Sequence, residues 1–124
     1  MPHRPVLLVV DDEADFLTTY RRLLGRDGFR VVTAATRSEA LAALAAEQFA
    51  VVVTDVRLPD GDGLDVVRAA TDHGRKPTAV IVVSGFTSRH ARDAALVAGA
   101  VDFFAKPFDA VALAARIREL AGAA

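Results

Sequence analysis

The chain has 124 residues, of which 52% are hydrophobic and 25% charged, with a formal net charge of −1 and no cysteine. This composition is typical of one globular domain spanning residues 1–124, and it excludes a disordered chain, disulfide bonds and cysteine-based zinc sites. Only two of the 15 basic residues are lysines and the arginines are scattered, so direct binding of nucleic acid is not expected.

Two features of the chain bear on its location. No apolar run approaches the roughly 20 residues that a membrane-spanning helix needs. Acidic residues follow the N-terminus too early for a signal peptide. We therefore expect a cytoplasmic protein without a membrane partner.

Five apolar runs alternate with five helical patterns along the chain. The runs cover residues 6–10, 31–33, 50–54, 79–83 and 101–104. The apolar stripes of the helices are formed by Phe16, Tyr20, Leu23 and Leu24; Leu41, Leu44 and Ala45; Leu64 and Val67; Ala91, Ala95 and Ala98; and Leu113, Ile117 and Leu120. Residues 121–124 are predicted to be a frayed tail or the remnant of a linker.

This alternation predicts an α/β fold, because strands that alternate with helices pair in parallel through right-handed crossovers. Three of the apolar runs are continuous rather than alternating, which indicates strands covered by helices on both faces. The periodicity alone leaves the strand order open.

Polar side chains gather where the predicted strands end. The first strand runs into Asp11 and Asp12, and the third runs into Asp55. The fourth ends at Ser84 and the fifth at Lys106. Because the carboxyl ends of parallel strands lie at one edge of the sheet, we expect these side chains to meet in one crevice.

The acidic residues of this crevice predict a metal site. Two carboxylates repel each other by about 4 kcal/mol at 4 Å and an effective dielectric near 20. Mg²⁺ suits the site because it takes oxygen ligands, of which one or two are carboxylates. Taken singly, Asp11 is more typical of a helix cap, and Asp55 is typical of a turn after a strand. Their convergence with Ser84 and Lys106 favours the metal site.

Asp55 is the predicted nucleophile of the crevice. Carboxylates form aspartyl phosphates, and phosphoryl transfer depends chiefly on placement and on neutralisation of charge. Lys106 would supply a positive charge to one phosphoryl oxygen, and Ser84 a hydroxyl donor to another. Each of these two residues alone is also typical of an ordinary strand end.

Four segments of the chain carry a resemblance to a known family. They are LLVVDDE, VVVTDVRLPDGDG, IVVSG and GAVDFFAKPF. In this order and spacing, the chain from Val6 to Leu120 resembles a CheY-like response regulator receiver domain of bacterial two-component systems. The resemblance implies a single (βα)5 flavodoxin-like domain with a parallel sheet of strand order 2-1-3-4-5.

The resemblance also implies roles for single residues. Mg²⁺, for which Mn²⁺ is expected to substitute, would be held by Asp11 or Asp12, by Asp55 and by the backbone carbonyl of Arg57. Asp55 would be the phosphoacceptor, Ser84 the switch hydroxyl and Lys106 the phosphate-binding cation. The family also implies a cis peptide bond between Lys106 and Pro107, which is physically reasonable for a bond that precedes proline.

The family places a switch aromatic three residues before the lysine, which is Phe103 in this chain. Its ring would turn into the space that Ser84 leaves on phosphorylation and so change the surface of the fourth helix, fifth strand and fifth helix. The usual residue is tyrosine, so the missing hydroxyl weakens the expected coupling. A plain core aromatic is the alternative interpretation of Phe103.

The predicted function is a signalling switch phosphorylated on Asp55 by a sensor histidine kinase. It would act on a downstream protein or output domain. We expect a phosphoacceptor that promotes its own phosphorylation and dephosphorylation rather than a turnover enzyme. Charges on the last two helices are typical of a solvated face, and would also suit a symmetric dimer through the fourth helix, fifth strand and fifth helix.

Two alternatives remain from other functional classes. One is a Mg²⁺-dependent phosphohydrolase with an aspartate nucleophile, which would need an acid where this chain has Arg57. The other is a flavin or nucleotide binder, which Asp11, Asp12 and Glu13 disfavour because they would repel phosphate.

Overall fold

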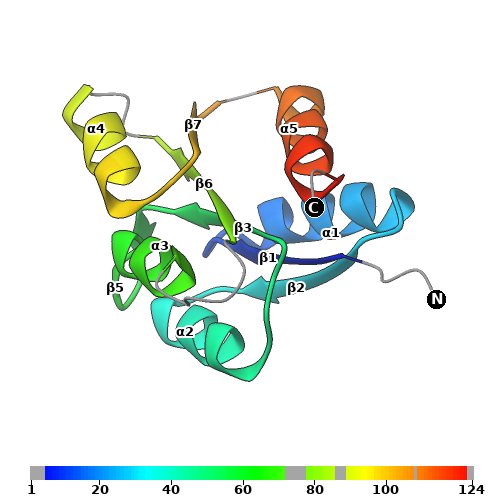
Figure 1. Cartoon of the computed structure of the whole chain (residues 1–124), viewed down its shortest axis with the longest axis horizontal. Coiled ribbons are helices and arrows are strands. Elements are labelled where there is room, and N and C mark those ends of the chain that lie inside the picture. The colour runs from blue at the N-terminus through cyan, green and yellow to red at the C-terminus, as the bar shows by residue number, and fades with distance from the viewer. Residues whose placement is uncertain (1–4, 72–77, 86–88, 108, 123–124) are drawn as a thin grey trace.

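The computed structural model describes residues 5–71, 78–85, 89–107 and 109–122, and Figure 1 shows how their elements are arranged. In chain order the elements are β1 (Val6–Val10), α1 (Ala14–Arg26), β2 (Arg30–Ala34), α2 (Arg37–Ala46), β3 (Val51–Asp55), β4 (Arg57–Leu58), β5 (Gly61–Asp62), α3 (Leu64–Thr71), β6 (Ala79–Ser84), α4 (Arg89–Ala98), β7 (Asp102–Ala105) and α5 (Ala110–Gly122). The predicted strands and helices are all present, and the ends of the predicted strands shift by at most one residue.

Five of the strands form one parallel sheet in the order β2-β1-β3-β6-β7. The fourth and fifth strands expected from the sequence are β6 and β7, so the order 2-1-3-4-5 is confirmed. Helices α1 and α5 cover one face of the sheet, and α2, α3 and α4 cover the other (Figure 1). The domain is thus a doubly wound α/β sandwich.

Strand β1 shows why its sequence is continuously apolar. Leu8 and Val10 point into the core under α2, α3 and α4, whereas Leu7 and Val9 point into the core under α1 and α5. All four side chains are at most 1% exposed. A strand with helices on both faces needs apolar residues at every position, which is the pattern that predicted it.

Short polar side chains accept hydrogen bonds from backbone N–H groups at the start of three helices, α2, α3 and α5. Thr36 accepts a hydrogen bond from the backbone N–H of Glu39 at the start of α2, 3.0 Å away, which is one contact of a capping box. The Glu39 carboxylate accepts from the backbone N–H of Ala35 at 2.8 Å. Asp109 accepts from the N–H of Val111 at the start of α5. These bonds satisfy N–H groups that have no partner within the helix.

The C-terminal helix extends farther than the sequence predicts. Helix α5 runs through Gly122, and Ala121 is buried against the α1 and α5 side of the sheet, where a frayed tail was expected. Ala121 continues the spacing of Leu113 and Ile117, so it lies on the same face of the helix. Residues 123 and 124 lie outside the described residues.

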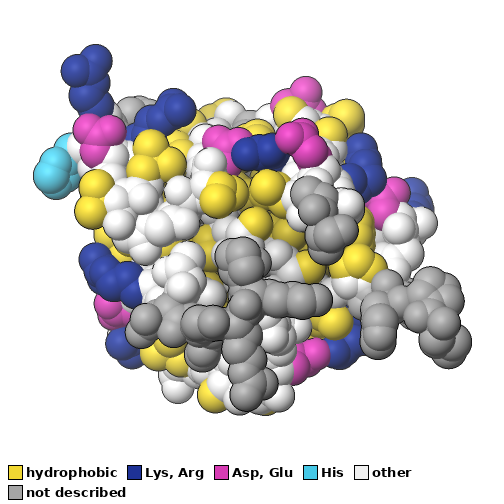
Figure 2. All heavy atoms as spheres, in the orientation of Figure 1, with side chains coloured by type: hydrophobic (Ala, Val, Ile, Leu, Met, Phe, Trp, Pro, Cys, Tyr) yellow, Lys and Arg dark blue, Asp and Glu magenta, His cyan; other side chains and the backbone are white. Residues whose placement is uncertain are grey.

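The described ranges contain no helix that is both long and apolar enough to cross a membrane. Figure 2 shows most of the lysine and arginine side chains of the viewed face toward its margin and one between acidic groups in its upper part. This distribution agrees with the scattered arginines of the sequence.

The buried ring of Tyr20 leads to a pH prediction. Tyr20 is the only tyrosine of the chain, is 3% exposed and lies 4.7 Å from the ring of Phe16. Burial, together with the negative charge of Asp109, raises its pKa to about 12. An unfolded tyrosine ionises near pH 10, so the folded chain holds the proton more tightly. The protonated Tyr20 therefore contributes to the free energy of unfolding. This contribution is fully present below about pH 10 and is lost as the pH rises toward 12.

Tyrosinate absorbance followed in parallel with circular dichroism will measure this shift. We expect ionisation near pH 12 together with loss of structure, and a lower midpoint in Asp109→Asn. Ionisation near pH 10 in a chain that is still folded would contradict the prediction.

Candidate functional site

The carboxyl ends of four neighbouring strands meet at one edge of the sheet. Asp11 follows Val10, the last residue of β1, and Val10 pairs with Thr54 of β3. Asp55 ends β3 and pairs with Val83 of β6. Ser84 ends β6 and pairs with the last residue of β7, and Lys106 comes next. The predicted convergence of residues distant in the sequence is therefore present.

Lys106 directs its ammonium group into the acidic side chains. Its Nζ lies 2.8 Å from Oδ2 of Asp11 and 2.9 Å from Oδ2 of Asp55. A third carboxylate oxygen, Oε1 of Glu13, lies 3.2 Å away. One cation thus offsets the repulsion between carboxylates that come from different strands.

Burial changes the acid–base properties of this cluster. Asp11 is fully buried, and burial raises the pKa of its carboxyl even though Lys106 and the backbone N–H of Glu13 donate to it. Burial alone would lower the pKa of Lys106, but the hydrogen bonds and charges of Asp11 and Asp55 outweigh it and raise that pKa above its usual value. The ammonium is consequently charged at neutral pH.

The carboxylate of Asp55 is held at both oxygens while part of it faces solvent. Its Oδ1 accepts from the backbone N–H of Arg57 at 3.2 Å, and its Oδ2 accepts from Lys106. The side chain is 13% exposed. Asp55 therefore combines a fixed orientation with access from outside, as an attacking group requires.

A short antiparallel hairpin after Asp55 was not expected from the sequence. Strands β4 and β5 pair Arg57 with Asp62 and Leu58 with Gly61. Strands of two residues carry no periodicity, so the sequence indicated only a glycine-bearing turn. The hairpin fixes the backbone of Arg57, whose carbonyl is an expected metal ligand.

Two residues that sequence reasoning missed hold this hairpin in place. Asp60 accepts from the backbone N–H groups of Arg37 and Ser38 at 2.7 and 2.9 Å, and so joins the hairpin to the start of α2. Gly63 donates from its N–H to the carbonyl of Val56 at 2.6 Å. The only sequence signal for them was the segment PDGDG, which is also typical of any turn.

Gly63 lies against the backbone of the proposed nucleophile. A Cβ atom built on Gly63 would lie 1.8 Å from the carbonyl oxygen of Asp55. Only glycine permits this approach, which presses the start of α3 against the end of β3.

The remaining predicted site residues surround this cluster. Ser84 is fully buried, and its backbone carbonyl accepts from the N–H of Lys106 at 2.7 Å. Asp12 and Arg57 have exposed side chains, and Phe103 is partly buried on the α2, α3 and α4 side of the sheet. The expected cis bond between Lys106 and Pro107 is present.

The donor atoms of the cluster suit a small, hard dication. Within the described residues, no three histidine, cysteine or acidic side chains converge as a metal site. Mg²⁺ needs only one or two carboxylates, with carbonyl oxygens and waters as its other ligands. Asp11 and Asp55 share one ammonium, and the backbone of Arg57 is bonded to Asp55. The residues present fit Mg²⁺.

Comparison with known proteins decides the family. The family model that describes the response regulator receiver domain matches residues 7–118 of this chain. The chain belongs to the response regulator receiver family. This receiver domain is 39% identical over 118 residues to the transcriptional regulatory protein PrrA of Mycobacterium tuberculosis, an alignment that covers 94% of this chain and 49% of PrrA. It spans about half the length of most of the curated relatives it matches first.

Solved structures agree with the receiver assignment. A CheY-like receiver domain protein from Methanospirillum hungatei superposes with a TM-score of 0.90 at 30% identity, covering 98% of this chain and 96% of that one. A response regulator from Burkholderia pseudomallei, solved with a phosphorylated aspartic acid, a calcium ion and citrate, superposes with a TM-score of 0.83 at 28% identity, covering 96% of this chain and 69% of that one.

The receiver domain exposes apolar side chains near α4. Leu96 and Val97 of α4 are 42% and 88% exposed, and Val101 before β7 is 46% exposed. Figure 2 shows hydrophobic side chains on the surface in this region. Arg116 of α5 pairs with Asp102 at 3.0 Å within the chain. The expected dimer through this surface remains a prediction.

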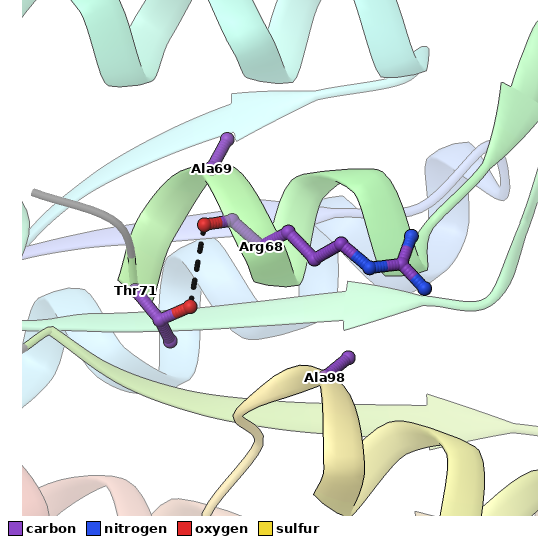
Figure 3. A pocket seen from close by; sticks show the side chains of 4 residues that line it. All are labelled: Arg68, Ala69, Thr71 and Ala98. Atoms are coloured by element: carbon purple, nitrogen blue, oxygen red, sulfur yellow. Dashed lines mark hydrogen bonds between the residues drawn. The ribbon is translucent and has the colours of Figure 1, made fainter.

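A separate groove lies between the ends of α3 and α4. Arg68, Ala69 and Thr71 line it from α3 and Ala98 from α4 (Figure 3). Thr71 donates from its hydroxyl to the carbonyls of Val67 and Arg68. Because the last turns of the two helices form it, the groove lies away from Asp55, which precedes the start of α3.

Proposed function

We propose that this receiver domain is a signalling switch that accepts a phosphoryl group from a sensor histidine kinase on the carboxylate of Asp55. The observation that carries the proposal is the Lys106 ammonium, which lies between the carboxylates of Asp11 and Asp55 at 2.8 and 2.9 Å. The phosphoryl group would then alter the surface of α4, β7 and α5 for a downstream protein or output domain. A cytoplasmic location is part of this proposal.

The proposed reaction is an in-line displacement at phosphorus. An oxygen of ionised Asp55 forms the new bond to phosphorus, while the bond from phosphorus to the donor nitrogen or oxygen breaks and its electron pair leaves with the donor. Lys106 exchanges a carboxylate for a phosphoryl oxygen and so stabilises the charge that is transferred. The hydrogen bonds to Arg57 and Lys106 keep Asp55 aimed at phosphorus throughout.

Mg²⁺ is the proposed cofactor of this step, with Mn²⁺ as a substitute. Asp11 or Asp12, Asp55 and the backbone carbonyl of Arg57 would hold it. When bound, it would supply positive charge that offsets the negative charge of the carboxylate and of the phosphoryl group. The cluster holds one cation for three carboxylates, which supports the need for further positive charge.

Ser84 and Phe103 are the proposed switch residues. Ser84 is buried at the end of β6, which pairs with β7. Strand β7 contains Phe103 and ends directly before Lys106. A hydroxyl drawn toward a phosphoryl oxygen would move the end of β6 and give the ring of Phe103 a new position. The ring already packs partly within the core on the α4 side of the sheet.

A turnover phosphohydrolase is the alternative function. It would need a proton donor two residues after the nucleophile, where the chain has exposed Arg57. We therefore propose a phosphoacceptor that promotes only its own phosphorylation and dephosphorylation.

Intact mass spectrometry after incubation with acetyl phosphate tests this proposal. We expect the mass of one phosphoryl group to be gained in Mg²⁺ or Mn²⁺ and not in excess EDTA. Hydroxylamine should remove it, because an acyl phosphate is cleaved by that nucleophile. Absence of the gain, or a gain that resists hydroxylamine, would contradict the proposal. Steady hydrolysis of a phosphomonoester would instead support the alternative.

A further inference from the structure

The third carboxylate on Lys106 comes from a residue to which the proposed reaction assigns no role. Oε1 of Glu13 lies 3.2 Å from Nζ of Lys106, and the Glu13 side chain is 67% exposed. Glu13 reaches the ammonium from the loop between β1 and α1, on the solvent side of the cluster.

Glu13 is not needed to begin the following helix. It occupies the N-cap position of α1, but its side chain makes no capping hydrogen bond. Oδ1 of Asp11 instead accepts from the backbone N–H of Glu13 at 2.9 Å. The carboxylate of Glu13 is therefore directed to Lys106 rather than to the helix, and removing its charge should leave the helix start intact.

The three carboxylates differ in how readily they can release the ammonium. A lysine ammonium has three N–H donors, and three carboxylates already surround that of Lys106. Asp11 is fully buried and held by the backbone, and Asp55 is the group to be phosphorylated. The exposed Glu13 can turn into water at little cost, because an exposed ion pair is worth roughly 0.2–1 kcal/mol.

We infer that the Glu13 carboxylate holds the place on Lys106 that a phosphoryl oxygen must take, and that it slows phosphorylation of Asp55 by this contact. The inference rests on the proposed function, which it deepens by naming a residue that sets the rate. Glu13 acts through Lys106 and is thus a positioning residue. The phosphoryl oxygen displaces it, and the free carboxylate moves into solvent.

The test compares phosphorylation rates with acetyl phosphate and Mg²⁺ at low ionic strength. Glu13→Gln should react about 1.4- to fivefold faster than the wild type, the range that follows from an exposed ion pair. Glu13→Asp keeps the charge but is one methylene shorter, so it should lose the contact and also react faster. Raising the salt to 1 M, where the Debye length is about 3 Å, should remove most of the difference.

Glu47→Gln is the matched control, because it removes the same charge at the opposite end of the molecule. Glu47 pairs with Arg30 near the amino ends of the strands, and its loss should leave the rate unchanged. Urea unfolding of the Glu13 variants should show that each is folded under the assay conditions, which separates the effect on the rate from a loss of folding.

Three results would overturn the inference. Glu13→Gln could react no faster than the wild type. Glu13→Asp could be phosphorylated at the wild-type rate while Glu13→Gln is phosphorylated faster. The effect would then come from the negative charge at this position and not from its contact with Lys106. A wild type that takes up no phosphoryl group would contradict the proposed function and this inference together, whereas the first two results contradict the inference alone.

Discussion

Replacing Asp55 with asparagine is expected to abolish the gain of a phosphoryl group from acetyl phosphate in Mg²⁺. The amide has nearly the same shape as the carboxylate but lacks its charge and its nucleophilic oxygen. Lys106 keeps its contacts with Asp11 at 2.8 Å and with Glu13 at 3.2 Å, so the variant should fold. Intact mass spectrometry measures the gain directly.

Asp93→Asn is the control for this experiment. Asp93 is an exposed acid on α4, so the variant loses one charge outside the cluster and should be phosphorylated as the wild type is. A phosphoryl group found on folded Asp55→Asn would show that another residue accepts it and would contradict the assignment of Asp55. Circular dichroism and urea unfolding establish that both variants are folded.

Replacing Gly63 with alanine should lower the free energy of unfolding by about 3 kcal/mol or more, the upper range for inserting an atom into a packed site. The new Cβ would lie 1.8 Å from the carbonyl oxygen of Asp55 and 2.8 Å from its carbonyl carbon. Both are backbone atoms, so no side chain can turn away to make room. The end of β3 or the start of α3 must move, which should also slow phosphorylation because Asp55 and Arg57 move with it.

Gly25→Ala is the matched control for Gly63→Ala. Gly25 lies within α1, and a Cβ there would meet nothing within 4 Å. Alanine in a helix is favoured over glycine by roughly 0.5–1 kcal/mol, so this variant should be slightly more stable than the wild type. Urea denaturation of both variants measures the difference. Equal unfolding midpoints for the two would contradict the steric argument.

The sequence determined much of the fold because the relevant signals are local. A strand buried on both faces must be continuously apolar, and a helix on one face must repeat its apolar residues every three or four positions. Both patterns are readable within a dozen residues. The strand ends were therefore predictable, and with them the meeting of Asp11, Asp55 and Lys106, because parallel strands end at one edge.

Local patterns failed where an element was too short, or where a residue packs against a part of the chain that lies outside its own local pattern. The two-residue strands β4 and β5 have no period to detect. Ala121 was assigned to a tail because residues 121–124 form a low-complexity segment, yet it is buried in the same core as Ile117. Gly63 resembled any turn glycine until the carbonyl of Asp55 was seen against it.

Only the tertiary structure decided which carboxylates pair with the ammonium of Lys106. Lys106 meets Asp11 across 95 positions of the chain and Asp55 across 51, so no local rule states which carboxylates share its ammonium. The same holds for Glu13, which the sequence marked as an acid at the start of a helix and as one of three acids that would repel phosphate. The sequence by itself determined which residues stand at the strand ends, whereas the packing of strands distant in the chain decided which of their atoms touch.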